Sequence, residues 1–364
     1  MMYIHELKDW PRFVWNQERL SELLIQLRHL EGRLIGGMES IGFHFRDETV
    51  LQVLTQDVVK SSEIEGEILD KTLVRSSVAR HLGMDIAGLK NTDRNIEGVV
   101  EMTLDATQKF DEPLTKERLL KWHALLFPSG NKRITVGEWR KEVVQVVSGR
   151  IDKETVHFEA PPAERVDHEM KLFLEWFNQE TAMDLVLKAA IAHLWFVTIH
   201  PFEDGNGRIG RALCDLMLAR SEKSSHRFYS LSAQIQKERS SYYAILEQTQ
   251  KGNLDIGSWI EWFFNCMRRA IEEALVVLGW IRSKSQFWEM VAEISFNERQ
   301  RKIINRVWDG FEGKLTSSKW AKIAKCSQDT AYRDILDLID KGILAKNPDS
   351  GRNTSYHLKQ QQRL

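Results

Sequence analysis

Residues 200–211, HPFEDGNGRIGR, bring several chemically active side chains together in one short stretch. His200 titrates near neutrality, so its neutral form can take a proton from a hydroxyl. Asp204 offers a hard oxygen to Mg²⁺, and Arg208 and Arg211 carry guanidinium forks that suit phosphate oxygens. This set predicts phosphoryl or nucleotidyl transfer to a hydroxyl, a reaction in which positioning and charge neutralisation supply most of the catalysis.

Two helices are expected to position this stretch. Apolar residues recur at three- and four-residue steps across 184–199, which predicts a buried helix that Pro201 cannot continue. His200 therefore falls at a helix end, because a following proline disfavours the α conformation. A second helix is expected over 208–218, with an apolar side formed by its leucines and methionine.

Gly205, Asn206 and Gly207 are expected to form an anion site at the start of the second helix. Free backbone N–H groups point outward there, and the helix dipole favours negative charge. Glycines let the backbone approach a ligand closely, and successive N–H groups can form an anion nest. Gly210, in the first turn, is assigned to the same site. The alternative is a structural turn followed by solvated arginines, although arginines at a helix start oppose the dipole.

At these residues the chain resembles the Fic family, whose motif H-P-F-x-D/E-G-N-G-R-x-x-R is met at every fixed position. Fic proteins are mainly AMP transferases, which move AMP from ATP to a hydroxyl of a target protein. The resemblance implies that His200 is the general base, that Asp204 binds Mg²⁺ and that the segment around Asn206 is the anion hole. It also implies that Arg208 and Arg211 hold the β and γ phosphates.

A β-hairpin is expected in the region 143–150, where branched residues precede a Gly-bearing turn at 148–150. Fic proteins carry such a flap over the active site, and its exposed edge can align a target segment by strand addition. Val146 in this segment is assigned to the nucleotide site. The alternative is an ordinary hairpin that closes a helical core.

Tyr242 and Tyr243 match a tyrosine pair that family members often have near the adenine. An aromatic ring can stack on a nucleobase, so both are assigned to the nucleotide site. Burial in the core is the alternative for each ring.

Residues 61–66, SSEIEG, fit the inhibitory pattern S/T-x-x-x-E-G/N of this family. Ser61 and Glu65 are four residues apart and are expected on one helix face. In relatives with the pattern, the glutamate pairs with the second motif arginine, here Arg211, and blocks the productive γ-phosphate position. In some relatives it also supports removal of AMP from the target. A solvated acidic helix face is the alternative.

Composition narrows the class of protein. The net charge is −1, which gives no whole-chain argument for nucleic-acid binding, and the three cysteines suggest neither a disulfide framework nor a zinc site. The N-terminus has no apolar signal core, and no apolar run is long enough to span a bilayer. A cytoplasmic protein without a membrane segment is therefore expected.

The C-terminal segment 299–364 differs in charge, with 14 Lys and Arg against 7 Asp and Glu. Two short helices followed by two strands over 342–344 and 356–358 are expected there, with Ser317 and Ser318 capping the first helix over 319–325. This order resembles a winged helix-turn-helix. The DNA-facing candidates are Gln328, Thr330, Arg333 and Arg352, and protein contact or dimer packing is the alternative.

These observations predict a mainly α protein with a Fic-type helical core, a short β-hairpin flap, an N-terminal helical extension and a C-terminal winged helix. The expected boundaries are 1–100 for the helical region with the inhibitory helix, 101–270 for the core, 271–298 for a helical linker and 299–364 for the winged helix. The expected function is AMP transfer from ATP with Mg²⁺, inhibited by Glu65, in a homodimer. The alternatives are another nucleotide donor, AMP removal, or a DNA-binding regulator with a nucleotide-sensing core.

Overall fold

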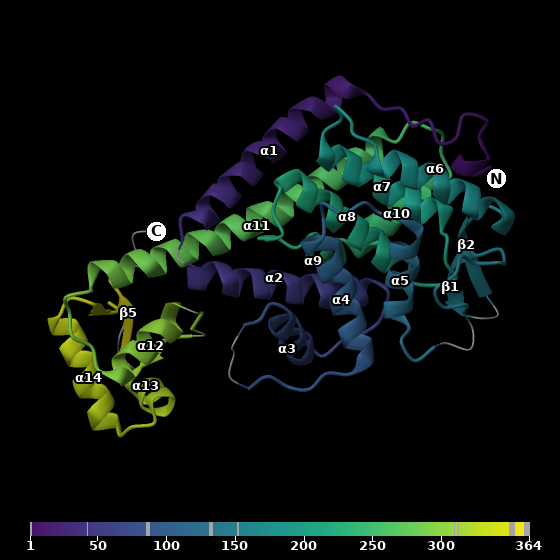
Figure 1. The fold of residues 1–364 in the computed structure, drawn as a ribbon. Coiled ribbons are helices and arrows are strands. Elements are labelled where there is room, and N and C mark those ends of the chain that lie inside the picture. The colour runs from purple at the N-terminus through teal and green to yellow at the C-terminus, as the bar shows by residue number, and fades with distance from the viewer. Residues whose placement is uncertain are drawn as a thin grey trace. The chain divides into compact units, whose positions relative to one another are not determined.

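The computed structural model describes residues 2–41, 43–84, 88–130, 134–150, 153–308, 310–311, 313–348 and 354–359. The chain divides into two compact units, Met1–Leu275 and Val276–Leu364. Both are built mainly from helices with small antiparallel sheets, which confirms the predicted mainly α class (Figure 1). Among the described helices, none combines the length and the apolar character needed to cross a bilayer.

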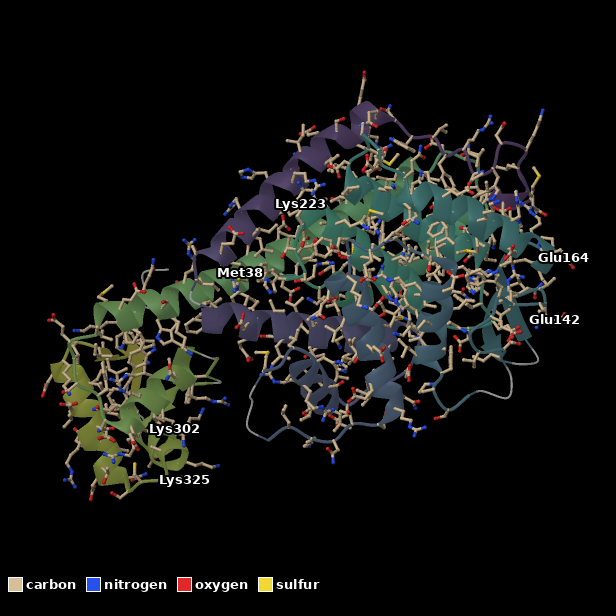
Figure 2. All side chains as sticks on the ribbon, viewed as in Figure 1. Met38, Glu142, Glu164, Lys223, Lys302 and Lys325 are labelled. Atoms are coloured by element: carbon tan, nitrogen blue, oxygen red, sulfur yellow. The ribbon has the colours of Figure 1, made fainter. Side chains whose placement is uncertain are left out.

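Unit 1 is a bundle of helices whose interior is filled by side chains (Figure 2). Its helices are η1 (Ile4–Glu6), α1 (Gln17–Glu39), α2 (Phe43–Ile64), α3 (Lys71–His81), α4 (Arg94–Gln108), α5 (Lys116–Leu126), η2 (Ala163–Arg165), α6 (Val166–Asn178), α7 (Leu185–Ile199), α8 (Asn206–Glu222), α9 (Leu231–Lys237) and α10 (Arg239–Gln250). The long helix α11 (Gly257–Met290) begins in unit 1 and ends in unit 2.

The centre of unit 1 is α7, which packs along α8. Every residue of α7 after the first is buried, as expected of a helix that is apolar all round. Asp184 caps its start by accepting from the backbone N–H of Val186. Helix α8 is longer at both ends than the predicted 208–218, because Gly205 and Lys223 adopt left-handed conformations that set its limits.

The hairpin of unit 1 pairs β1 (Gln145–Arg150) with β2 (Lys153–Glu159) in antiparallel register. Val146 lies opposite Phe158, and the register shifts between Val146 and Val147. The turn expected at 148–150 is wrong, because these three residues pair with residues 153–155 as part of β1. The hairpin contacts α10 through β2 (Figure 1).

In its described residues, unit 2 contains the end of α11, a sheet of three short strands in the order β3-β5-β4, and three further helices around one apolar core. Trp320, Ile335 and Leu358 are fully buried in that core. The elements are α12 (Glu298–Trp308), β3 (Leu315–Thr316), α13 (Ser317–Ala324), α14 (Gln328–Asp340), β4 (Leu344–Lys346) and β5 (Ser355–Leu358).

Two boundaries in unit 2 differ from expectation. The N-cap of α13 is Thr316, whose side chain accepts from the backbone N–H of Lys319, so Ser317 and Ser318 already belong to the helix. The strand expected over 342–344 begins only at Leu344, because Gly342 has a positive φ and ends the turn after α14. The DNA-facing candidate Arg352 lies outside the described residues.

Gly98 on α4 shows how closely the helices near the motif pack. A Cβ atom at this position would lie 1.9 Å from the backbone oxygen of Leu125 on α5. We expect Gly98→Ala to lower the free energy of unfolding by about 1–3 kcal/mol, because overpacking forces the two helices apart. Chemical denaturation measures this.

Gly36→Ala on α1 is the matched control, since nothing lies within 4 Å of its added Cβ. Alanine is the better helix former, so this variant should be neutral or stabilised by up to about 1 kcal/mol. Equal stabilities for the two variants would contradict the close α4–α5 packing.

Candidate functional site

His200 stands at the end of α7 in a left-handed conformation, with φ 52° and ψ 58°. Its backbone N–H donates to the Phe196 oxygen at 2.9 Å, and its Nδ1 lies 3.1 Å from the Val197 oxygen. Because a carbonyl can only accept, this contact places the proton on Nδ1 and leaves the lone pair on Nε2. Burial lowers the pKa of His200, which favours the neutral imidazole that a general base needs.

The loop between α7 and α8 is locked by the side chain of Asn206. Its Nδ2 donates to the Phe202 oxygen at 2.8 Å, and its Oδ1 accepts from the Phe202 N–H at 3.0 Å. Gly205 has φ +82°, which glycine adopts at little cost. The side chain of Asn206 is therefore used within the protein, and the groups left for an anion are the backbone N–H groups of the first turn of α8.

Arg211 is buried and makes three contacts with the end of α2. Its Nε donates to the Ser61 Oγ and its Nη2 to the Ser61 backbone oxygen, both at 2.8 Å. Its Nη1 donates to the Glu65 Oε1, also at 2.8 Å. The structure thus brings together the three residues that the sequence motifs single out, Ser61, Glu65 and Arg211.

Arg208 is held by a second carboxylate from the same turn. Its Nη1 donates to the Glu67 Oε2 at 2.8 Å, while the Asp204 Oδ1 is 3.9 Å from its Nη2. The guanidinium also lies over the Phe127 ring, 5.2 Å from the centroid. Both motif arginines are therefore paired with carboxylates that follow α2.

The turn at the end of α2 explains how two glutamates reach two arginines. Helix α2 ends at Ile64, so the prediction that Ser61 and Glu65 share a helix face is wrong, and Glu65 lies in the turn. The N–H groups of Gly66 and Glu67 donate to the oxygens of Glu63 and Ser62, and Gly66 has φ +86°. This is a Schellman motif, which needs a left-handed residue at the position of Gly66.

Glu65 also fixes the residue type at position 207. A Cβ atom built on Gly207 would lie 2.0 Å from the Glu65 Oε1. Desolvation alone would raise the pKa of Glu65, but the charge and hydrogen bond of Arg211 outweigh it and hold the pKa below its usual value. Glu65 is therefore an anion seated against the start of α8, where the helix dipole favours negative charge.

Two cavities are lined by residues of this site. One of about 620 Å³ is lined by the hairpin, α10 and the motif, and the other of about 590 Å³ is a more polar hollow beside the end of α2. Glu65 is the one residue that both linings share among those described. The larger cavity includes Val146, His157, His200, Gly207 and Tyr243, and the smaller includes Glu67, Asn95, Phe127, Asp204 and Arg208.

The two predicted tyrosines differ in their placement. Tyr242 is 2% exposed, and its hydroxyl is 2.8 Å from the Nε2 of His193, so most of this ring belongs to the core. Tyr243 donates from its hydroxyl to the Ile64 oxygen at 3.2 Å and lines the larger cavity with its neighbour. Tyr243 is the better placed of the two for a planar ligand in that cavity.

Val146 and Gly210, both assigned to the nucleotide site from the sequence, differ in their position relative to the cavities. Val146 reaches the larger cavity from β1. Gly210 lies inside α8, where an added Cβ would be 3.0 Å from the Val197 side chain on α7, and it lines neither cavity. Its position is explained by close helix packing, while a direct contact with a nucleotide is not supported by the geometry.

Two residues near the site were not assigned from the sequence. Glu67 would have followed from treating Gly66 as a helix C-cap signal, which turns the next residue back toward the helix end. His123 on α5 is fully buried, its ring stacks on Phe202 with centroids 4.1 Å apart, and its Nδ1 accepts from the Gly137 N–H at 3.0 Å. Burial lowers the pKa of His123 to about 4, so it is a neutral structural group.

A resident metal centre finds no support in the described part of the chain, where no three His, Cys, Asp or Glu side chains are grouped to hold an ion. Asp204 is a single half-exposed carboxylate beside the smaller cavity. One carboxylate fits a Mg²⁺ ion that arrives already bound to phosphates, because Mg²⁺ in such sites keeps several waters.

Comparisons with known proteins agree with this geometry. Residues 113–218 match the Fic/DOC family model, and residues 3–84 match a domain of unknown function, DUF4172. A probable protein adenylyltransferase of Aquifex aeolicus is 32% identical over 95 residues, which are 26% of this chain and 27% of that protein. The protein adenylyltransferase Fic of Drosophila melanogaster is 30% identical over 157 residues, which are 40% of this chain and 30% of that protein.

The matched part of the chain thus spans less than a third of the length of these curated relatives. A crystal structure of a Fic family protein from Desulfovibrio desulfuricans G20 superposes with a TM-score of 0.58 at 21% identity. The superposition covers 96% of this chain and 98% of that one, which shows a shared fold. The motif between α7 and α8 lies within the residues 113–218 that match the Fic/DOC family model, and the chain shares the fold of a Fic family protein.

Proposed function

We propose that this protein transfers AMP from ATP to a Ser, Thr or Tyr hydroxyl of a target protein, and to its own hydroxyls. One observation carries the proposal. His200, whose Nδ1 contacts a carbonyl and whose pKa is lowered, ends the helix before the loop that leads into α8 and its two arginines. A base beside an anion site is what transfer of a nucleotidyl group requires. The curated relatives named as protein adenylyltransferases support the same reaction class.

The proposed reaction assigns a role to each group. The Nε2 of His200 takes the proton of the target hydroxyl, whose oxygen attacks the α-phosphorus of ATP. The bond from that phosphorus to the bridging oxygen breaks, and pyrophosphate leaves with the electron pair. Arg208, Arg211 and the backbone N–H groups at the start of α8 neutralise the leaving phosphates. Asp204 would hold Mg²⁺, which supplies further charge neutralisation when bound.

We further propose that the turn after α2 inhibits this reaction. Glu65 and Glu67 pair with the two arginines that the phosphates need, and a carboxylate on a guanidinium imitates a phosphate. ATP in the productive position must therefore displace both carboxylates. Release of this turn would open the two cavities to each other, because Glu65 lines both.

The first prediction for this function concerns AMP transfer itself. With α-³²P-ATP and Mg²⁺, Glu65→Gly should label itself, and target proteins in a lysate, at least tenfold more than wild type, because Arg211 is freed for the γ-phosphate. His200→Ala in the Glu65→Gly background should abolish the label, because the hydroxyl loses its base. Gel autoradiography gives the readout.

A folded Glu65→Gly variant that labels no more than wild type would remove Glu65 from the inhibitory role. Absence of label in every variant, with and without lysate, would contradict ATP as the donor. Label that appears from another α-labelled nucleoside triphosphate would support the same chemistry with a different base, and faster loss of AMP from a prelabelled target would support AMP removal.

The second prediction concerns Glu67. Calorimetric titration with a non-hydrolysable ATP analogue and Mg²⁺ should show Glu67→Gln binding about three- to tenfold more tightly than wild type, because the partly exposed ion pair no longer competes for Arg208. Glu63→Gln in the last turn of α2 is the matched control, since Glu63 pairs with Lys60 outside the site. Equal affinities for the two variants would show that Glu67 does not oppose the nucleotide.

A second candidate function is DNA binding by unit 2, favoured by one observation. The acidic residue Asp334 in the middle of α14 is turned inward, where Arg299 donates to it from Nε at 2.8 Å. The outward side of the helix carries Tyr332 and Arg333, both exposed, and the helix before it exposes Lys322. Arg333 and Lys322 are cations suited to phosphate contact, on a surface that also exposes Asp329 and Asp340.

The third prediction tests this candidate with the full chain. In a gel-shift titration on random-sequence duplex DNA at 50 mM salt, the wild type should bind, and Arg333→Ala should bind several-fold more weakly, with steep loss of affinity as salt rises. Lys341→Ala is the control, because Lys341 is paired with Asp337. No shift at 50 mM salt, or equal loss in both variants, would contradict the candidate.

A further inference from the structure

Arg140 connects the catalytic loop to the rest of the core. It precedes β1, is only 2% exposed, and bonds the backbone of three consecutive residues at the end of α7. Its Nε donates to the His200 oxygen at 2.7 Å, its Nη2 to the Ile199 oxygen at 3.3 Å, and its backbone N–H to the Pro201 oxygen at 2.9 Å. These bonds satisfy carbonyls that a helix end leaves without partners.

The same guanidinium also holds both ends of the hairpin. Its Nη1 donates to the Glu142 oxygen at 2.8 Å, before β1, and its Nη2 donates to the Pro161 oxygen at 2.5 Å, after β2. Figure 2 labels Glu142 beside the hairpin. One side chain thus ties the conformation of His200 to the base of the β-hairpin.

The backbone of His200 needs such support. A non-glycine residue in the left-handed region is disfavoured by roughly 1 kcal/mol or more, and it persists where neighbouring structure fixes it. The described residues give Arg140 no salt bridge, and its donors go to backbone carbonyls. The fork geometry of arginine suits this arrangement of several carbonyls, which a lysine cannot reproduce.

We propose that Arg140 is a positioning residue that fixes the imidazole of His200 for base catalysis and couples its placement to the hairpin. The inference rests on the proposed AMP transfer for its kinetic consequence, but its structural consequence is measurable without that reaction. Arg140 touches the backbone of the base and the hairpin, and it lines neither cavity.

The charge of Arg140 has a second effect on His200. Burial lowers the pKa of His200, and Arg140 lowers it further, while the Val197 carbonyl, Glu65 and Asp204 act in the opposite direction. These are the groups that face the imidazole from α7, the turn after α2, the motif loop and the segment before β1. Loss of the Arg140 charge should therefore raise the pKa of His200 and leave less neutral base at a given pH.

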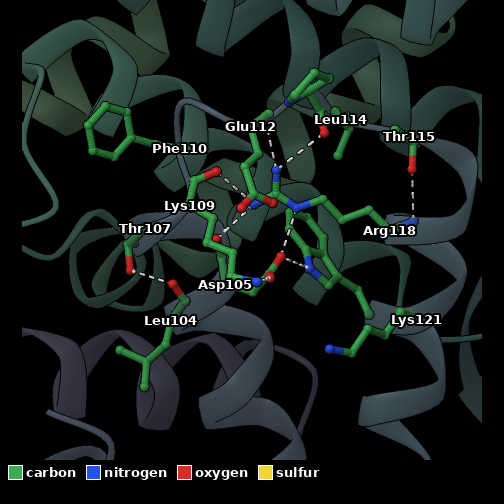
Figure 3. Close-up of polar contacts among 12 residues, drawn as sticks. Leu104, Asp105, Thr107, Lys109, Phe110, Glu112, Leu114, Thr115, Arg118 and Lys121 are labelled. Carbon is green, nitrogen blue, oxygen red and sulfur yellow. Dashed lines mark hydrogen bonds and ion pairs between the residues drawn. The ribbon is translucent and has the colours of Figure 1, made fainter. Parts of the chain in front are cut away.

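Arg118 on α5 is a partly buried arginine that also binds several backbone carbonyls, and it serves as the control. Its Nη1 and Nη2 donate to the oxygens of Glu112 at 3.1 Å, Lys109 at 3.0 Å and Asp105 at 2.8 Å (Figure 3). None of these partners belongs to the candidate site. Replacing Arg118 removes a similar set of carbonyl bonds, together with the ion pair of its Nε with Asp105 at 2.7 Å, without touching the motif loop or the hairpin.

The kinetic test uses Glu65→Gly as the parent. Arg140→Lys should lower kcat by about 10- to 100-fold with KM for ATP within about twofold, because the base is misplaced while the phosphate groups stay. Arg140→Met should in addition move the acid limb of the pH–rate profile to higher pH. Arg118→Lys should leave kcat and the profile unchanged, even where its melting temperature falls.

The structural test is an NMR titration of the His200 ring in ¹⁵N-histidine-labelled protein, with His200→Ala identifying the signal. In Arg140→Met the pKa of His200 should rise, and in Arg140→Lys the preference for the Nδ1-protonated tautomer should weaken. If Arg140→Met does not fold, the tautomer preference of His200 in Arg140→Lys provides the test. Folded variants whose His200 signal matches the parent would overturn the proposal, whether or not the parent transfers AMP. A Glu65→Gly parent that transfers no AMP would instead contradict the proposed function alone.

Discussion

The end of α2 meets the start of α8 through Arg211, and the rest of the site depends on this contact. The Nη1 and Nη2 of Arg211 reach Glu65 and the backbone oxygen of Ser61, each at 2.8 Å. One helix presents carbonyls and a carboxylate, and the other presents free N–H groups and arginines, so opposite ends of two helix dipoles face each other. The start of α8 requires an anion, and the protein supplies one from its own chain.

Several features follow from that requirement. Position 207 admits only glycine because Glu65 occupies the space of a Cβ. Gly66 is the left-handed residue of a Schellman motif, and it directs Glu67 to Arg208. The carboxylates are held where phosphates would be stabilised, so the proposed inhibition and the proposed catalysis use the same groups. The lowered pKa of His200 favours its neutral form, and Arg140 donates a hydrogen bond to its backbone oxygen.

The features that could be predicted from the sequence are those set by neighbouring residues or by a known motif. The helix before Pro201, the anion site at Gly205 and the contact of Glu65 with Arg211 could be expected from residue types and a known motif. Other features depend on partners distant in sequence. Asn206 was assigned to the nucleotide, yet its side chain locks the loop against Phe202. Gly210 was assigned likewise, yet it serves the packing of α8 on α7. Arg140 carried no motif role, because its carbonyl partners come from both ends of a hairpin and another helix.

The central claim is that the turn after α2 and the phosphates of ATP compete for the same two arginines. A crystal structure of Glu65→Gly with Mg²⁺ and a non-hydrolysable ATP analogue tests it most directly. We expect the β and γ phosphates at the N–H groups of Asn206 and Gly207 and within hydrogen-bond distance of Arg208 and Arg211, with the α-phosphorus facing the Nε2 of His200. A nucleotide bound elsewhere, with Glu67 still on Arg208 and the start of α8 empty of phosphate, would contradict the account.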